Sequence, residues 1–209
     1  MQAKTERQVR SDTAGKILDL AETLIQTRGY NAFSYQDIAD ALGVTKTSIH
    51  YHFESKTDLG VAVIERYTKS FGDALLGIAA SDTATSMSML DHYTRPFLQF
   101  AETSDRVCLC GALAGEVLAL PEPLRQRVET FFKAHQQWLA DILKRGVARG
   151  EFDLVASPMK TARTIFGALQ GALLVKRATG DLSQLKDVVS AIKLQLMKRS
   201  SPERDPISL

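Results

Sequence analysis

Hydrophobic side chains recur along this chain every three to four residues, the spacing that gathers them on one side of an α-helix. The pattern predicts an all-α fold, and no segment is rich in the residues that favour strands. Ser11 or Asp12 can cap a first helix, which Gly29 ends. Further helices are expected over residues 35–42, 46–53, about 56–74, 87–102, 105–118, 122–149, 158–179 and 182–198, with a loop over 77–86.

Two short helices joined by a tight turn are expected within Ser34–Leu59. Ser34 precedes an apolar run and Asp37 follows three residues later, a variant of the capping box with Asp in place of Glu or Gln. Gly43 ends the first helix, since a left-handed cap residue is easiest without a Cβ. Thr45 then caps the second helix. The segment is therefore predicted to be a helix-turn-helix unit.

The outer face of the second helix is polar and cationic. Such a face suits the major groove of DNA, which admits a helix and offers donors, acceptors and thymine methyl groups. We expect Lys46, Thr47 and His50 at base edges and Lys56 at a phosphate. The alternative is that these side chains are caps and solvated surface. The candidate DNA-binding residues are Ser34, Tyr35, Gln36, Thr45, Lys46, Thr47, Ser48, His50, Tyr51, His52 and Lys56.

The order of residues from Ile38 to Leu59 resembles the DNA-binding signature of the TetR family of one-component repressors, I-A-x-x-L-G-V-[ST]-x-x-[ST]-[IL]-x-x-[HY]-F-x-[SN]-K-x-x-L. With the preceding helix, the resemblance covers about residues 12–64. His50 departs from the Tyr that family members often carry, so the family's base preference is not carried over. The matching residues are Ile38, Ala39, Leu42, Gly43, Val44, Thr45, Ser48, Ile49, His52, Phe53, Ser55, Lys56 and Leu59.

The resemblance implies a DNA-binding domain followed by a helical domain that binds an effector and dimerises. We place the first over residues 1–56, beginning with a polar arm over 1–10, and the second over 57–200, with a flexible tail over 201–209. The partners implied are double-stranded DNA with a palindromic operator, a second copy of the chain and a small molecule. A DNA-bound interaction protein with a non-transcriptional partner and no effector is the alternative.

Composition adds a few limits. The chain has 209 residues, 44% of them hydrophobic and 24% charged, which is ordinary for a globular protein. The formal net charge of +2 is weak evidence for nucleic acid. Within residues 1–58, however, most positive groups are placed at the predicted arm and at the second helix and its exit, and placement matters more than the total. With two cysteines, no signal peptide and no apolar run long enough to span a bilayer, we expect a cytoplasmic protein.

Two C-terminal segments offer a dimer interface. Gly167 and Gly171 lie one helical turn apart, and small residues let another helix approach closely. The next helix carries an apolar stripe of Leu185, Val189, Ile192 and Leu196. The alternative is that both helices pack inside one subunit.

The sensing chemistry is less defined. Cys108 opens the pattern C-L-x-x-x-L-x-x-E-V, which is similar to the branch of TetR-type regulators that includes electrophile- and acrylate-responsive repressors. That resemblance implies a sensor thiol at Cys108, with Lys176 as the counterpart of a later lysine. A nearby ammonium group lowers a thiol pKa. The alternative for both Cys108 and Cys110 is a buried small hydrophobe.

A reversible effector pocket is the other possibility. Its candidate lining is mostly aromatic, and such residues are more often plain core. No phosphate loop, metal-ligand spacing or nucleophile motif occurs, so we expect no enzyme activity, no metal and no cofactor. The candidate residues are Tyr93, Phe97, Phe100, Phe131, His135, Trp138, Phe166 and Gln170.

Overall fold

The computed structural model describes residues 2–79, 84–103 and 105–197, with residues 2–11 described by their helical backbone. Over these ranges the chain forms nine α-helices, a 3-10 helix and an isolated β-bridge between Phe152 and Met197, which confirms the all-α prediction. No helix within them is both long and apolar enough to cross a membrane. The elements are α1 Gln2–Arg28, α2 Tyr35–Leu42, α3 Lys46–His52, α4 Lys56–Ala79, α5 Ser86–Thr103, α6 Leu109–Gly115, η1 Val117–Ala119, α7 Glu122–Ala148, α8 Pro158–Thr179 and α9 Ser183–Leu196.

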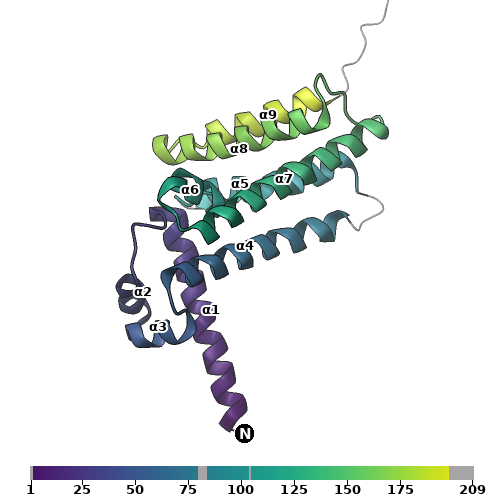
Figure 1. Cartoon of the computed structure of the whole chain (residues 1–209). Coiled ribbons are helices and arrows are strands. Elements are labelled where there is room, and N and C mark those ends of the chain that lie inside the picture. The colour runs from purple at the N-terminus through teal and green to yellow at the C-terminus, as the bar shows by residue number, and fades with distance from the viewer. Residues whose placement is uncertain (1, 80–83, 104, 198–209) are drawn as a thin grey trace, which may run out of the picture.

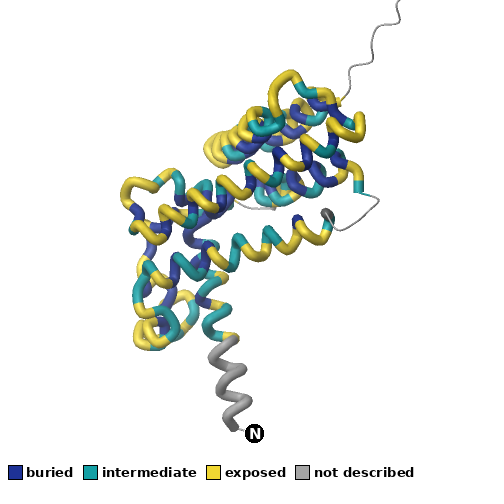
Figure 2. The backbone as a smooth tube through the Cα atoms, turned by 45° about the vertical axis from the view of Figure 1, so that its right-hand side comes forward, coloured by how far each residue is buried: buried dark blue, intermediate teal, exposed yellow. Residues whose placement is uncertain are grey.

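The helices form two groups (Figure 1). The short helices α2 and α3 lie beside α1 and pack on it, and Ile38 of α2 and Ile49 of α3 are fully buried. Helix α4 leads from this group into a layered bundle, in which α8 and α9 lie together on one side of α7 and α5. Figure 2 shows the buried positions on the sides of the helices that face one another. The helix-turn-helix unit therefore projects from the larger bundle.

Three predicted boundaries were wrong. Helix α1 starts at Gln2, so the arm expected over residues 1–10 is helical from residue 2; its Gln, Lys, Glu and Arg residues are good helix formers. Helix α4 continues to Ala79 because Leu75 is buried against the bundle. Helix α6 starts only at Leu109, because the Val107 backbone amide donates instead to the Gln26 carbonyl of α1, at 3.3 Å. The tail predicted over 201–209 lies outside the described residues.

Candidate DNA-binding surface and sensing region

The start of α2 has the predicted capping box. The Ser34 hydroxyl accepts hydrogen bonds from the backbone amides of Gln36 and Asp37, at 3.2 and 3.4 Å. The Asp37 carboxylate accepts in return from the Ser34 amide and hydroxyl, at 2.7 and 2.6 Å, and these bonds lower the pKa of Asp37. Gly43 ends α2 with φ +65°, a left-handed conformation that favours glycine. These contacts fix where the turn between α2 and α3 begins.

Helix α3 turns its polar side outward. Thr45 caps it as predicted, accepting a hydrogen bond from the Ser48 amide at 3.1 Å. Ile49 is fully buried on the inner side, whereas Tyr51 on the outer side is 64% exposed. A hydrogen-bonding face is thus presented on a helix with a fixed start. The exposed candidates are Ser34, Gln36, Thr45, Lys46, Thr47, His50 and Tyr51, with Ser48 and His52 at intermediate exposure.

Tyr35 has an internal position. The sequence predicts it among the DNA-binding residues, but Tyr35 is only 8% exposed. Its hydroxyl donates to the Phe53 carbonyl at 3.0 Å, and its ring lies edge-on to His50 with centroids 4.8 Å apart. Burial raises the pKa of Tyr35 to about 12. Tyr35 therefore holds the end of α3 against α2.

Lys56 also has internal partners. Its ammonium group donates to the Phe33 carbonyl, and it lies 4.6 Å from the ring centroid of Tyr30 and 4.3 Å from that of Phe33. Burial lowers the pKa of Lys56, and the charges of Glu116 and Asp37 act in the opposite direction. The lysine fixes the start of α4 on the α1–α2 turn. A DNA phosphate would therefore have to bind the same ammonium group that already contacts Phe33 and Tyr30.

Glu116 joins the two groups of helices, a role that the sequence did not predict. Its carboxylate accepts hydrogen bonds from Tyr30 and Asn31, which lie 86 and 85 positions earlier. Arg177 of α8 donates to the carbonyls of Gln26 and Thr27 in the last turns of α1. Helical periodicity predicts only neighbours that are close in sequence, so it does not identify partners at such separations. In the sequence, Glu116 stood out only as part of the motif that begins at Cys108.

Both cysteines are buried, as expected if they serve as small hydrophobic core residues. Cys108 is 3% exposed and precedes α6, and the Tyr67 hydroxyl lies 3.8 Å from its sulfur. Burial raises the pKa of the Cys110 thiol well above its usual range, and it does the same to Tyr67. Lys176 lies on the buried side of α8. A reagent would reach Cys108 only after local opening.

Most of the aromatic candidates pack against one another. The Tyr93 hydroxyl and His135 Nδ1 are 3.0 Å apart, and the His135 ring lies 3.9 Å from the Phe131 centroid. Burial lowers the pKa of His135 to about 4. Tyr93 stacks on Trp138 with centroids 5.3 Å apart and lies 6.0 Å from Phe97. This cluster is core, and Phe100 packs against it, whereas Phe166 and Gln170 also line a cavity.

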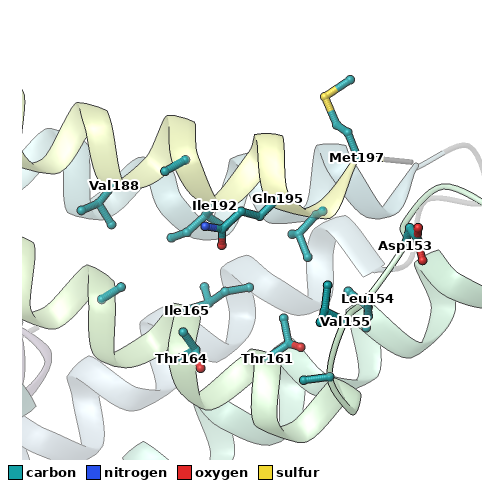
Figure 3. A pocket seen from close by; sticks show the side chains of 14 residues that line it. Asp153, Leu154, Val155, Thr161, Thr164, Ile165, Val188, Ile192, Gln195 and Met197 are labelled. Atoms are coloured by element: carbon teal, nitrogen blue, oxygen red, sulfur yellow. The ribbon is translucent and has the colours of Figure 1, made fainter. Parts of the chain in front are cut away.

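The predicted dimer residues divide into two sets. Gly167 and Gly171 are exposed on α8, and a Cβ at either would meet nothing within 4 Å. The stripe on α9 packs inside the subunit, as its alternative interpretation expects, because α9 needs an apolar face to bind α8. A groove of about 580 Å³ lies between α8 and α9. Figure 3 shows Thr164 of α8 and Val188 of α9 among the side chains that line it. The inward-facing residues are Leu185, Val189, Ile192 and Leu196.

Both groups of helices are similar in sequence to known proteins. Residues 17–63 match the model of bacterial regulatory proteins of the tetR family, and residues 87–192 match that of the tetracyclin repressor-like C-terminal domain. An uncharacterized HTH-type transcriptional regulator from Lactococcus lactis subsp. lactis is 29% identical, covering 90% of this chain and 94% of its own. The HTH-type transcriptional repressor NemR of Escherichia coli K12 is 23% identical, over 87% and 92%.

Solved structures with a similar fold belong to the same kind of protein. The crystal structure of a TetR family regulator from Agrobacterium tumefaciens superposes with a TM-score of 0.86 and 29% identity, covering 90% of this chain and 100% of that one. The relatives are regulators of transcription and not enzymes. Since both family models match in the expected order, the second alone over half of the chain, this protein belongs to the TetR family of bacterial transcriptional regulators.

Proposed function

We propose that this protein is a homodimeric repressor that binds a palindromic operator through two copies of α3 and releases it when a small molecule binds the C-terminal helices. DNA contact is assigned to residues 1–56, and sensing and dimerisation to 57–200. The observation that carries the proposal is the outward polar face of α3, which is capped by Thr45 and anchored by buried Ile49. A recognition helix needs such a face to read base edges.

Dimerisation is supported by the outer side of α8. Gly167 and Gly171 leave open space there, and Leu174 and Val175 expose apolar side chains beside them. Exposed apolar side chains next to small residues suit close packing of a second helix. A single helix-turn-helix module buries too little surface for tight and specific binding, so two modules related by a two-fold axis fit the function better.

A reversible ligand is favoured over covalent sensing at Cys108, because that sulfur is nearly inaccessible. Electrophile sensing is the second candidate. It is supported by the Tyr67 hydroxyl 3.8 Å from the Cys108 sulfur, a polar contact that a purely apolar core position lacks.

Fluorescence anisotropy tests these assignments. The full-length protein is titrated onto a duplex selected from a random pool, before and after treatment with a maleimide, with Cys108→Ser and, as the matched control, Cys110→Ser. We expect tight binding that the maleimide leaves unchanged. Release in the parent and in Cys110→Ser but not in Cys108→Ser would establish the electrophile sensor instead. Absence of any selected duplex would reject the repressor.

A further inference from the structure

A cavity of about 550 Å³ lies where the C-terminal end of α1 meets α6 and α8. Its walls combine apolar side chains, among them Val107, Phe132 and Phe166, with two arginine residues. They also include Gly167 and Leu174 of the α8 face proposed for the dimer, so this cavity borders that interface. Arg28 comes from α1 and Arg177 from α8. An apolar pocket with a few polar groups is the usual form of a small-molecule site.

The charge in this cavity favours an anion. Within the described ranges, no carboxylate lies in salt-bridge distance of Arg28 or Arg177. Glu116 also lines the cavity, but its two oxygens already accept three N–H hydrogen bonds from Tyr30 and Asn31. The Arg177 guanidinium is bound only to neutral carbonyl oxygens in its described contacts. A carboxylate is a stronger acceptor for it than a carbonyl.

Gln170 supplies a second polar group. Its side chain lies against Gly111, where a Cβ would be 2.5 Å from Oε1. Its Nε2 is buried and has no hydrogen-bond partner among the described residues. A buried donor without an acceptor costs free energy, so an acceptor atom on a ligand would stabilise this side chain.

We propose that the cavity binds a medium-chain monocarboxylate, with the carboxylate on Arg177 and the apolar chain against Phe132 and Phe166. The proposal rests on the proposed function, because this ligand is taken to be the effector. Pairing with the carboxylate draws Arg177 away from the carbonyls of Gln26 and Thr27 at the end of α1. Helices α2 and α3 pack on α1, so ligand binding and the position of α3 are coupled.

Calorimetric titration of the full-length protein with octanoate and with 1-octanol tests the site. We expect octanoate to bind at least about tenfold more tightly than 1-octanol, as one charge-assisted contact implies. Arg177→Gln should remove most of this difference, whereas Arg163→Gln, at an exposed position of α8 outside the cavity, should preserve it. Equal binding of the two probes, or no binding of octanoate, would overturn the proposal.

A second variant separates binding from stability, because Arg177→Gln also removes contacts with α1. Gly115 lines the cavity, and a Cβ there meets nothing within 4 Å, so Gly115→Leu fills the space without a clash at Cβ. We expect loss of octanoate binding at an unchanged melting temperature. Octanoate binding that persists in Gly115→Leu places the ligand elsewhere and rejects the site.

A DNA-release experiment distinguishes the repressor proposal from the ligand-site proposal. Octanoate is added to the protein bound to its selected duplex, and anisotropy is expected to fall in the parent but not in Gly115→Leu. Failure to bind any duplex would reject the repressor function, while calorimetry would still test whether the cavity binds octanoate. Octanoate binding without DNA release overturns the effector assignment alone.

Discussion

The Glu116 carboxylate accepts a hydrogen bond from the backbone amide of Tyr30, with Oε1 2.8 Å from the nitrogen. Its other oxygen accepts from the amide and the side chain of Asn31, at 2.9 and 2.7 Å. Gly29 has φ +97°, and a Cβ there would lie 2.0 Å from Glu116 Oε1. The turn between α1 and α2 is thus shaped around a carboxylate from the junction of α6 and η1. Glu116 and Arg177 together fix α1 relative to the bundle.

Removing this carboxylate should cost stability. We expect Glu116→Ala to lower the free energy of unfolding by about 1–3 kcal/mol, since it leaves the Tyr30 amide without its acceptor. The matched control is Glu65→Ala, which breaks an exposed ion pair with Arg127 and should cost less than about 1 kcal/mol. Urea denaturation measures both. Equal losses in the two variants would mean that the Glu116 contacts do not join the two helix groups.

Lys46 and Lys56 should differ in how their replacement affects DNA binding and stability. Lys46→Ala, at an exposed position, should weaken binding unequally among operator variants, as a base-edge contact implies, and leave the melting temperature unchanged. Lys56→Ala should weaken binding to all duplexes by a similar factor and lower the salt dependence of binding by about one unit. It should also destabilise the fold by about 1–2 kcal/mol, because its ammonium group binds the Phe33 carbonyl and two rings. Anisotropy at several salt concentrations and thermal unfolding check both. Losses that differ between operator variants would contradict a phosphate role for Lys56.

Local contacts explain why part of this site was predictable. The caps at Ser34 and Thr45 and the end of α2 at Gly43 depend on groups within four positions of one another, so residue type and spacing identify them. Tyr35 and Lys56 have partners 18 and 23 positions away, in Phe53 and Phe33. Their roles follow from how the helices pack, which spacing alone does not specify.

The stripe on α9 illustrates the same limit. Periodicity correctly identified an apolar face containing Leu185 and Ile192, but a face looks the same whether its own subunit or a partner covers it. The structure covers it with the subunit's own helices. A large apolar residue of α9 that is exposed is instead Leu194, at 69%.

The proposed dimer should depend on α8. Gly171→Arg places a long charged side chain in the open space of the exposed face, so we expect it to produce monomers that bind a palindromic duplex far more weakly. Ala134→Arg, at an exposed position of α7, is the matched control and should remain dimeric. Light scattering after size-exclusion chromatography measures the mass of each. A dimeric Gly171→Arg would exclude this face as the interface.

Acid should unfold this protein partly through His135. Its pKa falls from 6.5 to about 4 in the folded state because burial disfavours the imidazolium, and the neutral Nδ1 is free to accept from the Tyr93 hydroxyl. Below pH 6.5 the unfolded state therefore binds the proton that the folded state excludes, so stability is complete above that pH and falls as pH drops towards 4. The loss attributable to this residue approaches about 3 kcal/mol.

His135→Gln isolates this contribution, since an amide keeps a partner for Tyr93 but does not titrate. We expect the parent to lose about 3 kcal/mol more than the variant between pH 7 and pH 4 in urea denaturation, because groups common to both proteins cancel in the difference. If His135→Gln loses as much stability as the parent over this range, the imidazole takes up its proton without unfolding, and the cluster around Tyr93 admits charge.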